Sequence, residues 1–299
     1  MSKLIIRNAR LVNEGAITES DVLIEDERIA KIATSIKVDN NVCAIDAEGK
    51  FLIPGMIDDQ DHFREPGLTH KADLATESAA SVAGGITSFM EMPNVNPQTT
   101  NKDALKNKYG LAKDRCRANY SFYMGATNTN IEDIKSLEVN DACGIKAFLG
   151  ASTGDLLVDD PLALELLFEH APIIVVTHCE DTPLIRENEK KAKEKYGDDV
   201  PMSEHPYIRS DEVCYRSSST TYELAKKYDA LLHILHLTTA KEMELFSNHH
   251  RSEKRITAEV CVHHLWFDES SYPEKGALIK CNPAIKKKSD REALIEALN

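Results

Sequence analysis

The sequence predicts an α/β fold in which a small N-terminal β-sandwich-like domain precedes an incomplete (β/α)8 TIM barrel with about seven strands. From Leu52 onward, strand-like apolar runs alternate with helix-like polar segments, which is typical of a parallel sheet with right-handed crossovers. Several chemically active side chains stand at the ends of these runs, where (β/α)8 barrels carry their active sites. We therefore assign residues 1–51 to the small β domain and residues 52–299 to the barrel.

Residues 1–51 contain short strand-like segments separated by turns, and they show no helical period. Lys3–Val12 is the first expected strand. Asp21–Ile24 and Arg28–Ile32 are expected to form a hairpin around Glu25-Asp26-Glu27. This part of the chain is therefore expected to hold a small sheet of its own.

Seven runs rich in apolar or β-branched residues are the expected barrel strands: Leu52–Ile57, Ile86–Met92, Tyr120–Met124, Gly144–Leu149, Ile173–Thr177, Leu231–Leu237 and Ile256–Val262. The segments between them include the expected helices Lys71–Ala83, Asn101–Arg115, Pro161–Glu169, Ser217–Tyr228 and Ala240–Phe246. The chain stops inside a further helix-like run, 289–298, so an eighth strand would have to follow, and we expect a C-terminally truncated barrel. A doubly wound open sheet also fits seven strands, but it gives no reason for histidines at so many strand ends.

Composition narrows the classes of function. The apolar content of 42% and charged content of 28% are ordinary for a globular protein, and a net charge of −13 argues against nucleic acid as a partner. No apolar stretch reaches the roughly 20 residues that span a bilayer, and the N-terminus lacks a signal-peptide pattern. The seven cysteines are scattered singly, which indicates reduced thiols in a cytoplasmic protein, with no disulfide framework and no cysteine zinc site.

The most informative segment follows the first expected barrel strand and reads Gln60-Asp61-His62-Phe63-Arg64-Glu65-Pro66-Gly67. Strand alternation places Gln60, His62 and Arg64 on one face. An imidazole beside a guanidinium at the mouth of a strand suits a metal next to an anion.

Three more groups stand on other expected strands: Lys146 in the fourth, His178 at the end of the fifth and His236 at the end of the sixth. Imidazole is the commonest protein ligand for Zn²⁺, and three imidazoles around a barrel mouth could hold one or two metals. A single histidine at a strand end is more often a structural residue than a metal ligand. Three histidines at the ends of different expected strands, together with a lysine on a fourth, favour a metal site. Lysine is rarely buried, and burial lowers its pKa and makes its amine nucleophilic.

Three side chains are candidates for binding a substrate. Arg64 can clamp a carboxylate, although a surface ion pair with a neighbouring acid explains it equally well without the motif. Asn94 and Asn282 each follow a strand-like run and can donate and accept hydrogen bonds, although a turn role is as probable on local grounds.

The chain resembles the dihydroorotases of the metal-dependent amidohydrolase superfamily along its whole length. The segment from Gln60 is similar to their His-x-His-Phe-Arg-Glu-Pro-Gly signature. Further matching segments are Pro54–Asp58, Phe63–Lys71, Ala83–Asn94, Gly144–Lys146, Thr177–Glu180, His233–His236 and Asn282–Ile285.

The resemblance implies a specific activity and site. The activity would be the reversible cyclisation of N-carbamoyl-L-aspartate to L-dihydroorotate in pyrimidine (UMP) biosynthesis. The cofactor would be two zinc ions bridged by carboxylated Lys146, with His62, His178 and His236 as ligands. Arg64, Asn94 and Asn282 would bind this small-molecule substrate. A homodimer is compatible with the resemblance.

The sequence departs from the family in three places. Gln60 stands at the position of the usual first metal histidine, so one metal should be held more weakly. Asp61 replaces a residue that is usually apolar. The Asp-x-Ala-Pro-His motif, whose aspartate is the family's general base, is absent, so we expect that base beyond residue 299 and an impaired or inactive chain.

Two alternatives stay open. One is another cyclic amidohydrolase, although allantoinase-like sequences tend to have Asn in place of Arg64 and dihydropyrimidinase-like ones lack Phe-Arg-Glu-Pro-Gly. The other is a non-catalytic homologue that acts as a scaffold or regulatory partner, which Gln60 and the absent aspartate favour. Zinc content separates an enzyme from a non-catalytic homologue. An enzyme should bind about two zinc ions, and a non-catalytic homologue should bind one or none.

Overall fold

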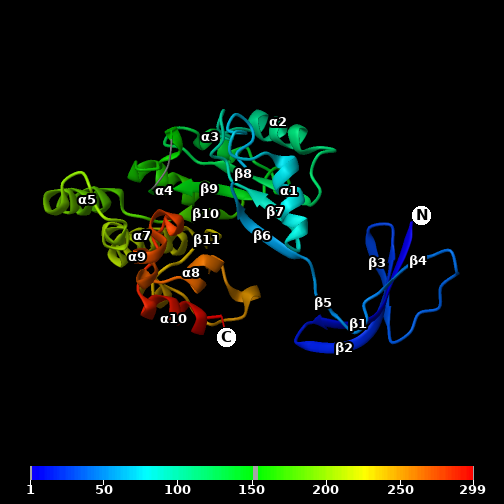
Figure 1. The fold of residues 1–299 in the computed structure, drawn as a ribbon. Coiled ribbons are helices and arrows are strands. Elements are labelled where there is room, and N and C mark those ends of the chain that lie inside the picture. Colours follow the sequence, from blue (N-terminus) through cyan, green and yellow to red (C-terminus); the bar gives the residue numbers. More distant parts are fainter. Residues whose placement is uncertain (1, 151–153, 299) are drawn as a thin grey trace. The chain divides into compact units, whose positions relative to one another are not determined.

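The computed structural model describes residues 2–150 and 154–298, and the chain forms two compact units (Figure 1). The smaller unit comprises Met1–Ile57 with Gly85–Thr87, and the larger comprises Asp58–Gly84 with Ser88–Asn299. The smaller unit thus extends beyond residue 51, where the sequence placed its end, and includes a short segment from further along the chain.

The smaller unit is a mixed sheet with strand order β3-β2-β1-β4, and β5 also pairs with β1. Its strands are β1 (Lys3–Asn13), β2 (Ala16–Glu25), β3 (Arg28–Ala33), β4 (Cys43–Asp46) and β5 (Phe51–Leu52). The predicted hairpin is confirmed, since Glu25 pairs with Arg28 across the turn. Ile5, Val22 and Ile36 are buried in this unit.

A seven-stranded sheet with the order β12-β11-β10-β9-β8-β7-β6 forms the centre of the larger unit. Its strands are β6 (Met56–Asp61), β7 (Ile86–Glu91), β8 (Asn119–Gly125), β9 (Gly144–Phe148), β10 (Val175–His178), β11 (Leu232–Ile234) and β12 (Ile256–Ala258). The pairs from β7 to β12 are parallel, as the alternating pattern predicts. The first predicted run was wrong in its bounds. Pro54 and Gly55 interrupt it, so Phe51–Leu52 joins the small sheet and the barrel strand begins at Met56.

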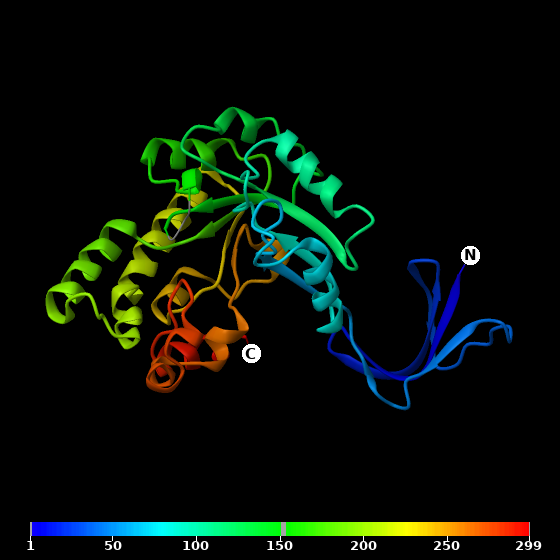
Figure 2. The same ribbon diagram turned by 45° about the horizontal axis from the view of Figure 1, so that its top comes forward.

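Helices follow most of these strands. They are α1 (Leu74–Ala83), α2 (Lys102–Ala112), α3 (Ile131–Lys135), α4 (Pro161–His170), α5 (Thr182–Tyr196), α6 (His205–Ile208), α7 (Asp211–Tyr228), α8 (Val262–Trp266), α9 (Tyr272–Lys275) and α10 (Lys288–Glu296). Figures 1 and 2 show α1 to α4 along the outer side of the curved sheet. Phe122 and Ile145 from the strands pack with Leu105 and Phe168 from the helices in one buried cluster. The core therefore lies between the sheet and the helix layer.

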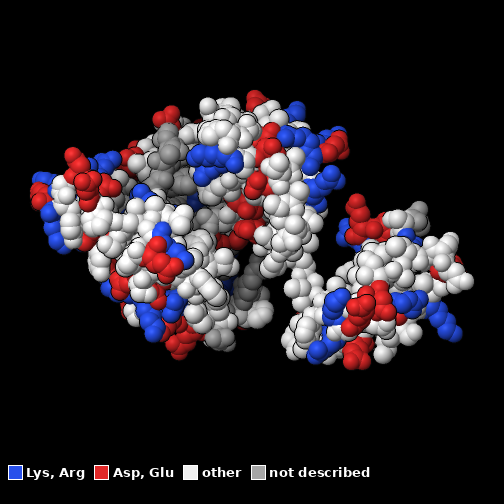
Figure 3. Space-filling model, viewed as in Figure 1, with Lys and Arg blue, Asp and Glu red and all other residues white. Residues whose placement is uncertain are grey.

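Several helical segments differ from the prediction. Helix α7 begins at Asp211 and not at Ser217, and the short helices α3, α6, α8 and α9 were not predicted. Ala240–Phe246 forms only a 3-10 helix (Lys241–Leu245), where the Glu242 carboxylate accepts hydrogen bonds from the Ser218 and Thr239 hydroxyls. Helix α5 was not predicted, because its sequence is strongly charged and only Ile185 and Ala192 in it are buried. Among the described residues, no helix combines the length and apolarity needed to cross a membrane. On the face in Figure 3, acidic and basic side chains are interspersed.

A buried ion pair links the second strand of the larger unit to its second helix. The Lys108 ammonium lies 2.7 Å from Glu91 Oε2 with both side chains fully buried, and it also donates to the Met92 carbonyl. The other Glu91 oxygen accepts the backbone N–H of Arg64 at 2.9 Å. The pair therefore connects the helix layer to the segment that carries Arg64.

Replacing Lys108 with Met should lower the free energy of unfolding by about 3–5 kcal/mol, because Glu91 would be left as an unpaired buried charge. Urea unfolding followed by circular dichroism measures the change. The same replacement at Lys106, which is exposed on the same helix, should stay within about 0.5 kcal/mol. Equal losses in the two variants would contradict the role assigned to the pair.

Candidate active site

His178 and His236 meet at the carboxyl ends of neighbouring strands. His178 is the last residue of β10, and His236 lies two residues after β11. Both side chains are buried, and His178 Nδ1 lies 3.0 Å from His236 Nε2. Two nitrogens bound to one tetrahedral zinc ion lie roughly 3.3 Å apart, since each Zn–N bond is about 2.0–2.1 Å. The pair is therefore spaced as two ligands of one ion would be.

A carboxylate behind His178 determines which ring nitrogen is available. His178 Nε2 lies 2.8 Å from Glu180 Oε2, and the Arg209 guanidinium donates to the same oxygen. Burial lowers the pKa of His178, so the ring is neutral at pH 7. With its one proton shared with Glu180, the ring presents the Nδ1 lone pair toward His236, the usual arrangement behind a metal ligand. Sequence reasoning missed this role of Glu180 two residues after His178, and nothing local indicated Arg209.

His62 directly follows β6 and is oriented by Asn94. His62 Nδ1 and Asn94 Oδ1 lie 2.9 Å apart, so the ring donates from Nδ1 and its Nε2 lone pair is free. Burial lowers the pKa of His62 to about 3, and the charge of Arg64 adds to the effect. His62 is therefore a neutral imidazole with one nitrogen available for a metal.

Arg64 reaches the same asparagine. Its guanidinium donates to the Asn94 carbonyl at 3.2 Å. Its backbone has a φ of 72°, in the left-handed region, and its N–H is held by Glu91. His236 also has a positive φ, of 41°. Strained backbone at non-glycine residues is common where structure holds a functional side chain in place.

Lys146 lies in β9 with only 1% of its surface exposed, and its Nζ is 4.5 Å from the centre of the Phe148 ring. Burial lowers the pKa of the Lys146 amine to about 7. The charge of Lys146 contributes to lowering the pKa values of His62, His178 and His236. The amine therefore lies close enough to interact electrostatically with all three imidazoles.

The other two predicted residues have different neighbours. Gln60 Oε1 accepts a hydrogen bond from the Cys261 thiol at 3.2 Å, just after β12. Asn282 is exposed and precedes Pro283, whose carbonyl lies against His264. In the described part of the chain, no hydrogen bond joins Asn282 to His62, Arg64 or Asn94.

A second group lies beside the first. His233 Nε2 is 3.6 Å from Asp59 Oδ2 and 3.5 Å from Glu259 Oε2. Burial, followed by the neighbouring Glu259, raises the pKa of Asp59 to about 7. Glu259 Oε1 also accepts the backbone N–H of His236, so this group supports the loop that carries a predicted ligand.

Asp61 differs from these paired acids. Its Oδ2 is buried without a hydrogen-bond partner among the described residues, and burial raises its pKa to about 8 from the usual 3.8. A carboxyl whose pKa is raised on folding costs stability as the pH rises from about 4 to 8, because the unfolded chain ionises first.

The Asp61→Asn variant should therefore be more stable than the parent. We expect a gain of about 1–2 kcal/mol at pH 8 and ~0.5 kcal/mol at pH 5, after allowing for the partial exposure of this group. Urea unfolding at the two pH values measures it. The Asp198→Asn variant, at an exposed position, should show no pH-dependent difference. A gain at Asp61 that does not grow with pH would contradict the assignment.

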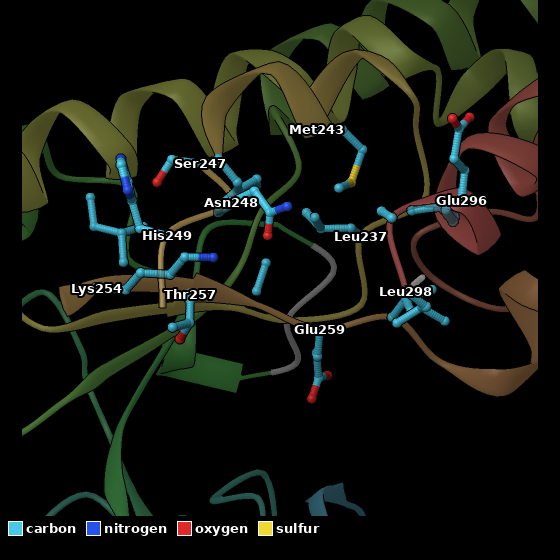
Figure 4. Close-up of a pocket in the computed structure, with 16 residues that line it drawn as sticks. Leu237, Met243, Ser247, Asn248, His249, Lys254, Thr257, Glu259, Glu296 and Leu298 are labelled. Atoms are coloured by element: carbon cyan, nitrogen blue, oxygen red, sulfur yellow. The ribbon is translucent and has the colours of Figure 1, made fainter. Parts of the chain in front are cut away.

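A cavity of about 650 Å³ runs along β12 and is lined in part by Glu259 of the second group. Figure 4 shows Thr257 and Glu259 beside it, with Leu237, Met243 and Leu298. None of the predicted metal or substrate residues is among the described residues that line it, so it is not the predicted active site.

Comparisons with known proteins give the family. A family model described as dihydro-orotase-like matches residues 49–188. Dihydroorotases from Bacillus cereus strain AH820 and Bacillus anthracis are each 31% identical over 309 aligned residues, covering 98% of this chain and 68% of the relative. The chain belongs to the dihydroorotase-like family of cyclic amidohydrolases. Proteins of this family are hydrolases and are generally metal-dependent.

Solved structures of amidohydrolases have the same fold. The L-hydantoinase (dihydropyrimidinase) from Arthrobacter aurescens matches with a TM-score of 0.90 at 27% identity, over 100% of this chain and 67% of that one. The dihydropyrimidinase from Brevibacillus agri matches with a TM-score of 0.87 at 21% identity, over 99% of this chain and 66% of that one, and shows the fold alone. The predicted class, an incomplete TIM barrel with a separate small sheet, is confirmed.

Proposed function

We propose that this amidohydrolase acts as a dihydroorotase, closing N-carbamoyl-L-aspartate to L-dihydroorotate and reversing the step. The observation that carries the proposal is the contact of Arg64 and His62 with one residue, Asn94. A guanidinium beside a neutral imidazole can hold a substrate carboxylate next to a bound metal. Dihydroorotate has such a carboxylate, whereas a simple dihydropyrimidine lacks it.

The donor set fits zinc. His62, His178 and His236 are neutral because burial lowers the pKa of each ring, and His62 and His178 each present an oriented lone pair. We propose these three histidines and Lys146 as the residues that hold the metal. Zinc would supply Lewis acidity toward the ring carbonyl and would activate water at neutral pH.

Lys146 would take part as a carbamate. Burial lowers the pKa of the Lys146 amine to about 7, which favours the neutral form near neutral pH, and a neutral amine attacks CO₂, forming an N–C bond and releasing a proton. The product is an oxygen ligand in place of a cation. Since an unmodified ammonium would repel a metal, carboxylation makes the buried lysine compatible with the three imidazoles.

Other residues keep these groups in place. Glu180, neutralised by Arg209, fixes the ring of His178. Asn94 fixes the ring of His62 and receives the Arg64 guanidinium at its carbonyl. In this arrangement, Arg64 sets the position of the substrate carboxylate relative to the metal.

The proposal is tested by a ligand panel on the zinc-loaded chain. L-dihydroorotate should bind at least about 10-fold more tightly than dihydrouracil, because a charged hydrogen bond contributes about 1.5–3 kcal/mol. Calorimetry measures binding, and release of carbamoyl aspartate measures turnover. Preference for hydantoin or dihydrouracil would instead favour the hydantoinase activity of the structural relatives. Zinc binding without affinity for any cyclic amide would favour a non-catalytic role.

A further inference from the structure

We propose that Cys261, His263 and His264 form a second cation site, suited to a borderline or soft divalent ion such as Zn²⁺ and separate from the imidazoles at the strand ends. The three residues follow β12, with Cys261 just before α8 and both histidines within it. One ligand atom from each lies within 4.8 Å of the others. This inference does not depend on the activity proposed above.

The spacing is close to that of a bound ion. With Zn–S of about 2.3 Å and Zn–N of about 2.0–2.1 Å, donor atoms around one tetrahedral zinc lie roughly 3.3–3.6 Å apart. Thiolate and imidazole are both preferred zinc ligands. Side-chain movements of about an ångström are therefore enough to close the group around an ion.

His264 gives an independent indication of a ligand. Its Nε2 lies 3.1 Å from the Pro283 carbonyl, so Nε2 carries the proton and Nδ1 has the free lone pair. Only 4% of the residue is exposed, and Nδ1 is buried with no hydrogen-bond partner in the part of the chain that the structure describes. Metal-binding histidines typically donate a hydrogen bond from one ring nitrogen to a carbonyl or carboxylate and bind the metal through the other nitrogen. The buried His264 ring, which has a carbonyl partner at Nε2, fits this arrangement.

Gln60 places a further donor beside the thiol. The Cys261 S–H donates to Gln60 Oε1 at 3.2 Å. When an ion binds, that proton passes to solvent, and the amide oxygen is left next to the thiolate, where it can act as the fourth ligand. Gln60 also stands where the family has its first metal histidine, so this contact is specific to a chain with this substitution.

The local charge favours a cation. Burial raises the pKa of the Cys261 thiol to about 12, and the carboxylates of Glu259 and Asp58 add to the effect. These acids produce a negative potential at the sulfur, which opposes a free thiolate and attracts a divalent ion. His263 and His264 are neutral, since burial lowers the pKa of each, and their ring centres lie 4.3 Å apart.

Titration of the full chain with Co²⁺ tests the site, because thiolate bound to cobalt gives a near-ultraviolet charge-transfer band that imidazoles alone do not give. The parent chain should show this band. The Cys261→Ser variant should lack the band and should bind one equivalent of cobalt fewer than the parent chain. The Cys43→Ser variant, at an exposed thiol, should keep the band, and so should His178→Asn. Circular dichroism establishes that each variant is folded.

Each other outcome would overturn the assignment. One is the absence of the band in the parent chain. The other is a band that survives in Cys261→Ser, including one that is lost instead in Cys281→Ser, whose thiol lies 3.6 Å from His264 Nε2. The histidines are tested separately, since His264→Gln should weaken cobalt binding at least about 10-fold while the thiol remains. Unchanged affinity in that variant would show that the buried ring is only a packing group.

Discussion

Replacing His178 with asparagine should reduce zinc affinity at the strand-end site at least about 100-fold. The variant removes one nitrogen of the pair that lies 3.0 Å apart, and it leaves Glu180 without the ring that it orients. Because loss of a mere supporting contact costs about 10–100-fold in metal affinity, loss of the ligand itself should cost more. Competition with a chromophoric chelator measures the affinity.

Controls separate this effect from general damage. The titration is best run in the Cys261→Ser background, so that only the strand-end site is counted. Glu180→Gln should have the intermediate effect of a supporting residue, and His170→Asn, at an exposed helix end, should have none. Unchanged zinc affinity in His178→Asn would remove this residue from the metal site.

Arg64→Met should weaken binding of L-dihydroorotate by about 10- to 150-fold and leave binding of dihydrouracil unchanged. The guanidinium would provide charged hydrogen bonds to a carboxylate, which contribute about 1.5–3 kcal/mol, and dihydrouracil has no such group. Zinc content should not change, since the proposed ligands are other residues. Calorimetry with both ligands gives the ratio.

The matched control is Arg117→Met, an exposed arginine on the same unit. It should bind both ligands like the parent chain. If Arg64→Met weakened both ligands equally, the side chain would support the loop after β6, through its hydrogen bond to the Asn94 carbonyl, and would not recognise the carboxylate.

The sequence predicted the barrel because its signal is local. Alternation of apolar strands with polar helices is visible along the chain, and parallel strands bring their carboxyl ends to one edge. His178 and His236 are therefore brought together by strand order alone. The break between β5 and β6 was misjudged because Pro54-Gly55 lies inside an otherwise continuous apolar run.

The supporting contacts could not be predicted in the same way. Arg209 reaches Glu180 from a loop before α7, and Lys108 reaches Glu91 from α2. Such pairs depend on side-chain positions across the fold, which no periodicity records. The thiol of Cys261 was expected to be an isolated cysteine, yet it lies 3.2 Å from Gln60, about two hundred positions away in the chain.

Anomalous scattering at the zinc edge, from crystals of the zinc-loaded chain, locates the metal relative to the proposed ligands. We expect a strong peak enclosed by His62, Lys146, His178 and His236, with density extending beyond the Lys146 amine where a carboxylate has been added. The proposed metal site would be contradicted if no zinc peak lay between these four side chains, whether zinc was absent or bound only elsewhere in the chain.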